Sequence, residues 1–125
     1  MGLGEFMLTL LHAVTNTHII HWQCIDRSYA EHQALGSFYD ELQDLVDNLM
    51  ESIMGKYQGQ VEFPANYYPP LPTGKEELEM LSDYVTEART TLPMDSEIQN
   101  AVDEIQALIN KTRFLLLSLI HISEP

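Results

Sequence analysis

Side chains that could bind a metal ion are concentrated in the first 51 residues of this 125-residue chain. They form an H-x-x-H-W element, a further histidine and a D-x-x-x-E pair, which are His18, His21, Trp22, His32, Asp47 and Glu51. Imidazole and carboxylate ligands together suit a first-row metal ion, and a carboxylate-rich set can bind both Fe(II) and the harder Fe(III). The pattern therefore predicts metal coordination, with iron as the leading candidate and zinc or manganese as alternatives.

Apolar residues that recur with a helical period predict four helices in a single domain, residues 1–117. Ser28 and Glu31 form an S-x-x-E capping box before the second helix, and Asp95 supplies an N-cap for the fourth. Four prolines between residues 59 and 74 predict a long surface crossover, because proline cannot continue a helix. We therefore expect an all-α, ferritin-like four-helix bundle with a long proline-rich crossover between its second and third helices. The helices are expected at about 3–25, 29–57, 75–91 and 95–117.

The apolar stripe of each helix predicts the core. In the first helix the stripe contains Leu3, Phe6, Met7, Leu10, Val14, either His21 or Trp22, and Ile25. In the second helix it contains Leu35, Tyr39, Leu42, Val46, Leu49 and Ile53. Cys24 is interpreted as a small buried hydrophobe. Trp22 is interpreted as an anchor for a second helix or subunit.

Helical geometry indicates which of the polar side chains can share a site. Each residue of a helix advances by about 100°, so His18 and His21 lie about 60° apart, and both flank the buried stripe. On the second helix, Asp47 lies about 60° and Glu51 about 100° around from His32. His18 is a reserve group beside the site, and the predicted ligands are His21, His32, Asp47 and Glu51. The alternative interpretation is that the histidines form a hydrogen-bonded polar layer between helices.

The charge, the apolar runs and the cysteine content of the chain limit the kinds of function that it can have. The net charge of −13 opposes binding to nucleic acid or to anionic lipid, and favours metal cations as partners. The apolar runs are too short to span a bilayer, and the N-terminus lacks the pattern of a signal peptide. A single cysteine excludes an intrachain disulfide, so we expect a cytoplasmic protein. Residues 118–125 resemble a translated sequencing adapter, and we expect them not to belong to the native chain.

The spacing of the polar residues resembles a known family. His18-x-x-His21-Trp22, the interval from His32 to Tyr39, and the D-x-x-x-E pair are similar to motifs of the Dps-type mini-ferritins. The stretch SYAEHQALGSFYDEL is similar to small ferritin-like proteins of tailed phages. The resemblance implies a ferroxidase that oxidises Fe(II) with peroxide or dioxygen at an inter-subunit site. It also implies a division of ligands, with His21 and His32 from one subunit and Asp47 and Glu51 from its partner.

Two other functions fit the same residues. One is a non-enzymatic, phage-type helical interaction protein, in which the histidines serve packing or hydrogen bonding. The other is a zinc-stabilised dimer without redox chemistry. We expect self-association as a homodimer or larger homo-oligomer in the metal-binding cases, because one subunit would hold only half of the ligands.

Overall fold

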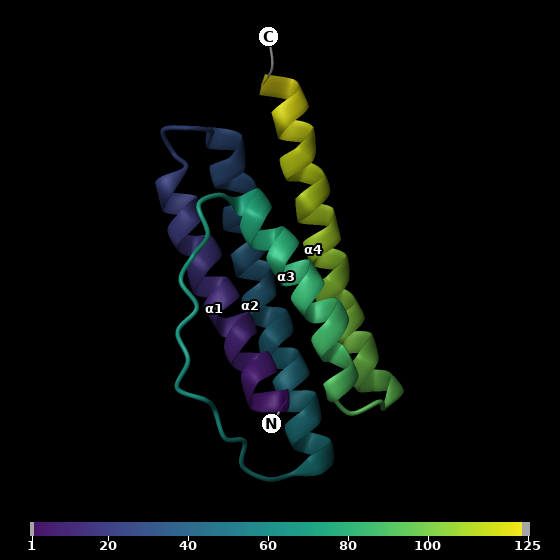
Figure 1. Cartoon of the computed structure of the whole chain (residues 1–125). Helices are drawn as coiled ribbons and strands as arrows, with labels where there is room; N and C mark the ends of the chain where they lie inside the picture. Colours follow the sequence, from purple (N-terminus) through teal and green to yellow (C-terminus); the bar gives the residue numbers. More distant parts are fainter. Residues whose placement is uncertain (1, 124–125) are drawn as a thin grey trace.

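The computed structural model describes the backbone of residues 2–123 and the side chains of residues 2–118 (Figure 1). No strand occurs in this part of the chain, so the prediction of an all-helical protein is confirmed. Its α-helices are α1 (Gly2–Gln23), α2 (Tyr29–Tyr57), α3 (Gly74–Ala88) and α4 (Ser96–Ser123), with a short 3-10 helix, η1 (Arg89–Thr91), after α3. The predicted bounds of the second helix match α2, whereas α1 ends two residues early and α4 continues beyond residue 117.

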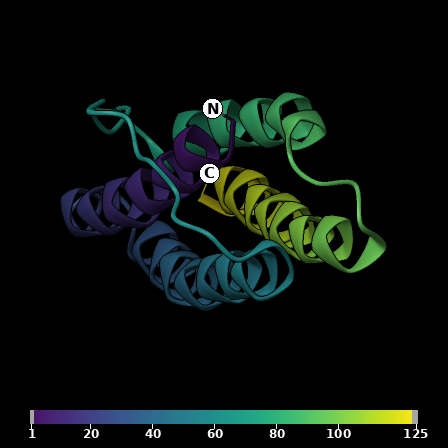
Figure 2. The same cartoon turned by 90° about the horizontal axis from the view of Figure 1, so that it is seen from below.

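Each α-helix packs against two others, as the end-on view in Figure 2 shows. α1 packs against α2 and α3. α4 also packs against α2 and α3, from the other side of the bundle. Residues 58–73 return along the length of α1 before α3 begins, so α2 and α3 run in the same direction (Figure 1). No helix among the described residues has the length and apolar character needed to cross a membrane.

The core largely follows the predicted stripes, with two corrections. On α2, Phe38 is fully buried where Tyr39 was expected, while the other five predicted positions are buried. On α1, Trp22 and Ile25 are 61% and 44% exposed, so their assignment to the core is wrong. The reason is that the buried face of α1 contains Ala13, Thr17 and Ile20 and is continued by Cys24 just after the helix, whereas Ile25 lies beyond the helix end and points outward.

Only one of the two hydrogen bonds of the predicted capping box is formed at the start of α2. Ser28 has extended backbone geometry, and its hydroxyl oxygen accepts a hydrogen bond from the Glu31 N–H at 3.1 Å. The Glu31 carboxylate does not return to Ser28. It accepts hydrogen bonds from Arg27 and from the backbone N–H of Gly74, and so ties the start of α2 to the start of α3.

We expect Ser28→Ala to lower the free energy of unfolding by about 1 kcal/mol, because one N–H at the start of α2 loses its acceptor. Urea denaturation followed by circular dichroism measures the change. Ser28→Asp is the matched control, since a carboxylate can accept the same hydrogen bond and should preserve stability. Equal losses in the two variants would contradict the capping role.

Candidate functional site

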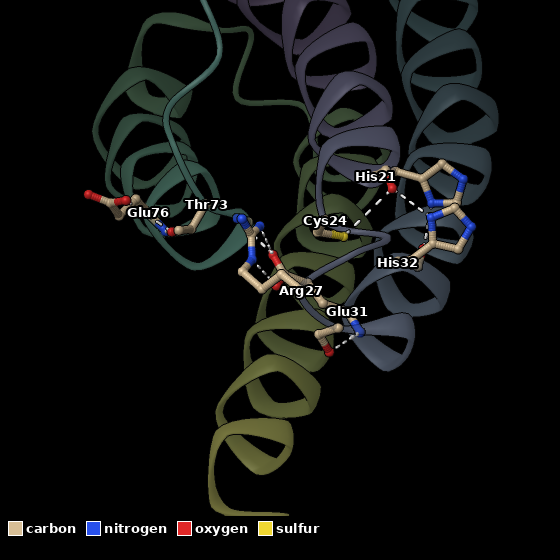
Figure 3. A network of polar contacts seen from close by, with 9 residues as sticks. His21, Cys24, Arg27, Glu31, His32, Thr73 and Glu76 are labelled. Atoms are coloured by element: carbon tan, nitrogen blue, oxygen red, sulfur yellow. Dashed lines mark hydrogen bonds and ion pairs between the residues drawn. The ribbon is translucent and has the colours of Figure 1, made fainter. Parts of the chain in front are cut away.

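His21 and His32 meet at the end of the molecule where α1 joins α2. His21 lies in the last turn of α1 and His32 in the first turn of α2, and a five-residue connection, Cys24–Ser28, brings them together. Their imidazole rings stack with centroids 3.7 Å apart and planes 12° apart (Figure 3). The two histidines that the sequence places in the site are therefore in direct contact within one chain.

The inner nitrogen of each ring is bonded to the backbone of the other histidine. Nδ1 of His21 lies 2.5 Å from the carbonyl oxygen of His32, and Nδ1 of His32 lies 2.6 Å from the carbonyl oxygen of His21. Since a carbonyl only accepts, both Nδ1 atoms carry the proton in the neutral rings, and both Nε2 atoms keep a free lone pair. Figure 3 shows these outer nitrogens on the same side of the pair, opposite the inner nitrogens that are bonded to the backbone carbonyls.

Gly36 makes this close approach possible, although it is not among the residues that the sequence predicts for the site. A Cβ atom at this position would lie 3.0 Å from Cε1 of His21, which is tighter than nine in ten contacts of real Cβ atoms. A glycine inside a long helical pattern, where it costs helix stability, was the available signal. Gly36 thus leaves room on α2 for the ring of His21.

The remaining aromatic side chains of this region extend the histidine pair into a ladder of rings. His18 stacks on Tyr39 at 4.1 Å and lies 4.4 Å from Trp22, while Tyr29 lies 5.7 Å from His32. Trp22 and Tyr29 are 61% and 62% exposed. We call Trp22, His18, Tyr39, His21, His32 and Tyr29 the aromatic ladder. The two ends of the aromatic ladder, Trp22 and Tyr29, are thus its largely exposed members.

An open surface cleft of about 590 Å³ borders the histidine pair. It contains one carboxylate, Asp40, and several neutral hydrogen-bonding groups. Beneath the pair, the buried thiol of Cys24 points to the carbonyl oxygen of His21 at 3.6 Å, and burial raises its pKa. Burial therefore favours the protonated thiol, which is a poor ligand, and the prediction that Cys24 is a small buried hydrophobe is confirmed. The cleft is lined by His21, Tyr29, His32, Gln33, Gly36, Ser37, Tyr39 and Asp40.

Asp47 and Glu51 do not join the histidines within one chain. Both are exposed on α2, and at about 1.5 Å a residue they lie about 22 Å and 28 Å along the helix from His32. Within the part of the chain that the structure describes, no three His, Cys, Asp or Glu side chains form a group able to hold a metal ion. A complete site would need ligands from outside this chain.

Comparison with known proteins gives the family. Residues 21–116 match a family of unknown function, DUF5856. The chain belongs to this family. It is also 26% identical over 117 residues to a protein of Enterobacteria phage T4, described as "Uncharacterized 14.6 kDa protein in mobD-ri intergenic region". That alignment covers 90% of this chain and 85% of the phage protein, while no solved structure gives a significant match.

The DUF5856 match corrects the family resemblance drawn from the sequence. Assignment to the Dps-type mini-ferritins, or to the ferritin-like proteins of phages, is wrong. The intervals behind it have low specificity, because residues seven apart share a face on any long helix. The relationship to a phage protein is confirmed, but its ferritin-like character is not.

Proposed function

We propose that this DUF5856 chain binds first-row divalent metal ions through Nε2 of His21 and Nε2 of His32. The observation that carries the proposal is the pair of Nδ1 hydrogen bonds to backbone carbonyls. Histidine ligands in proteins commonly donate their second ring N–H to such an acceptor, which fixes the ring and directs the other nitrogen to the metal. A bundle of four helices with one long crossover provides the rigid support for this pair.

The stacked arrangement favours one ion on each ring over a single shared ion. The ring planes are only 12° apart, and both rings turn Nδ1 inward and Nε2 to the same outer side, so the two Nε2 lone pairs lie side by side and do not converge on one point. The ring separation of 3.7 Å is close to the spacing of about 3.5–4 Å between ions in two-metal protein sites. Iron, zinc and manganese remain the candidate ions. Fe(II) oxidation at this site stays a prediction.

A second copy of the chain would supply the missing ligands. Asp47 and Glu51 are exposed on α2 and are in no ion pair among the described residues, so they are free to approach the histidines of a partner. The exposed ends of the aromatic ladder provide apolar contact area for the same interface. Because each chain carries a net charge of −13, bound cations would also relieve repulsion between the copies. The proposed dimer is therefore metal-dependent.

Titration of the metal-free chain with Zn²⁺ or Co²⁺, followed by calorimetry and sedimentation, tests the proposal. We expect His21→Ala with His32→Ala to weaken binding by about 100-fold or more, because each substitution removes a ligand. His12→Gln is the matched control and should bind as wild type does. Asp47→Asn with Glu51→Gln should keep weak binding but abolish the metal-induced dimer. Equal metal binding by wild type and the double histidine variant would contradict the proposal.

The second candidate is a non-enzymatic interaction protein, which the exposure of Trp22 and Tyr29 favours. In this case the stacked histidines serve only to hold the end of α1 against the start of α2. The double histidine variant would then lose stability, while neither it nor wild type would respond to metal ions. The same titration therefore separates the two functions.

A further inference from the structure

The cleft beside the histidine pair offers hydrogen-bond acceptors to a ligand. His21 and His32 contribute the lone pairs of Nε2, because a backbone carbonyl already holds each Nδ1 proton. Within the part of the chain that the structure describes, neither Nε2 atom has a hydrogen-bond partner and neither is buried, so a ligand from solvent can reach both. Asp40 adds an exposed carboxylate that is in no ion pair among the described residues. A ligand of this cleft must therefore bring donors.

An aromatic ring and a carboxylate mark the two ends of the cleft on α2. Tyr29 begins α2, and Asp40 follows after about three helical turns, so the two lie on the same face about 16 Å apart along the helix. The Tyr29 side chain is 62% exposed, and its ring lies beside that of His32 with centroids 5.7 Å apart. The cleft therefore combines a ring on which a planar group can stack with acceptors along the same helix face.

The two helices that form the cleft are acidic. Residues 1–55 contain eight acidic side chains and one basic side chain, Arg27. The guanidinium of Arg27 is already paired with Glu31 at 3.0 Å. No described residue that lines the cleft is a lysine or an arginine. The electrostatic field of this half of the molecule therefore attracts cationic ligands and repels anionic ones.

A guanidinium group fits this combination better than an ammonium group does. It has five N–H donors and no acceptor, and its planar, weakly hydrated surface stacks on aromatic rings. An ammonium is compact and strongly hydrated, so it gains less from an exposed tyrosine. A single side chain cannot cover about 16 Å, whereas about five residues of extended peptide can, at about 3.3 Å a residue. The matching ligand is thus a peptide segment with several arginines.

We propose that the cleft binds an arginine-rich segment of a partner protein. Guanidinium groups of this segment donate to Nε2 of His21 and of His32, stack on Tyr29 and pair with Asp40. Metal ions and arginine would compete for the same two nitrogens, so this binding goes beyond the proposed metal site and does not depend on it. It gives the interaction protein, the second candidate function, a partner of defined chemistry.

Calorimetric titration of the full chain with a hexa-arginine peptide tests the proposal. A chelator in the buffer makes the result independent of metal binding, and salt at about 0.15 M screens long-range attraction. We expect hexa-lysine, which has the same charge, to bind about tenfold more weakly, because ammonium groups neither stack nor fork as guanidinium does. Tyr29→Ala with Asp40→Asn should weaken hexa-arginine binding by about tenfold or more, since a stacking ring and a carboxylate are lost.

Tyr67→Ala with Glu104→Gln is the matched control. It also removes one exposed tyrosine and one exposed carboxylate, but neither residue lines the cleft, so hexa-arginine should bind as it does to wild type. The proposal is overturned if the control loses as much affinity as the cleft variant, or if the cleft variant loses none. Equal affinity of wild type for hexa-lysine and hexa-arginine also overturns it.

Nitrogen chemical shifts of the imidazoles report on the histidines directly. At about pH 8, where imidazole side chains are ordinarily neutral, the Nε2 signals of His21 and His32 should shift when hexa-arginine binds, because these atoms begin to accept hydrogen bonds. The Nε2 signal of His12, which does not line the cleft, should stay constant. Bound peptide with unchanged Nε2 signals of His21 and His32 would exclude them as acceptors and overturn the proposal.

Discussion

Phe38→Ala should lower the free energy of unfolding by about 3–5 kcal/mol, one of the largest effects available to a single substitution in this chain. Phe38 has 0% exposure and belongs to the central apolar cluster, so removing its ring leaves a cavity that the surrounding helices cannot fill. Urea denaturation monitored by circular dichroism measures the loss, provided that the variant remains folded in buffer.

Tyr39→Ala is the matched control, because it removes a neighbouring aromatic ring that is only partly buried. Its ring stacks on His18 at 4.1 Å, a contact worth about 1 kcal/mol. If Tyr39→Ala proved the more damaging of the two, Tyr39 and not Phe38 would be the residue that faces the core. The pair of variants therefore tests the rotation of α2 directly.

Gly4→Ala should lower the free energy of unfolding by about 1–3 kcal/mol, even though alanine favours helix. A Cβ atom at Gly4 would lie 1.9 Å from the backbone oxygen of Glu62, so either the crossover or α1 must move. Amide chemical shifts of residues 61–63 should change together with the stability. These changes would locate the displacement in the first half of the crossover.

Gly55→Ala is the control with the opposite expected sign. Nothing lies within 4 Å of a Cβ atom at Gly55, which is inside α2 near its end. The same substitution should there raise stability by about 0.5–1 kcal/mol through helix propensity alone. A neutral or stabilising Gly4→Ala would show that the crossover does not lie tightly on α1.

The sequence was most informative where local signals agreed. Ser28, the apolar period and the proline-rich segment together predict the bounds of α2 as the structure has them. Phe38 and Tyr39 are adjacent and both aromatic, so periodicity could not determine which one faces the core. The end of α1 was misplaced because Ile25 continues the apolar rhythm after the helix has stopped.

The candidate site was predictable in composition but not in geometry. Helical phase predicts that His21 faces the bundle, but the stacking on His32 depends on the path of the connection between their helices. Gly36 became interpretable only once the ring of His21 was seen beside it. Asp47 and Glu51 remain a prediction, since their distance from the histidines is fixed by helix length and only a partner could bridge it.

The contrast between the short α1–α2 connection and the long crossover also bears on the order of assembly. α1 and α2 are neighbours in the chain, and their contacts near the turn close only a small loop, so they can form early. α3 reaches α1 only after residues 58–73 have closed a much larger loop. The stacked histidine pair thus belongs to the part of the protein that can form early, whereas the contacts of α3 with α1 belong to the part that docks last.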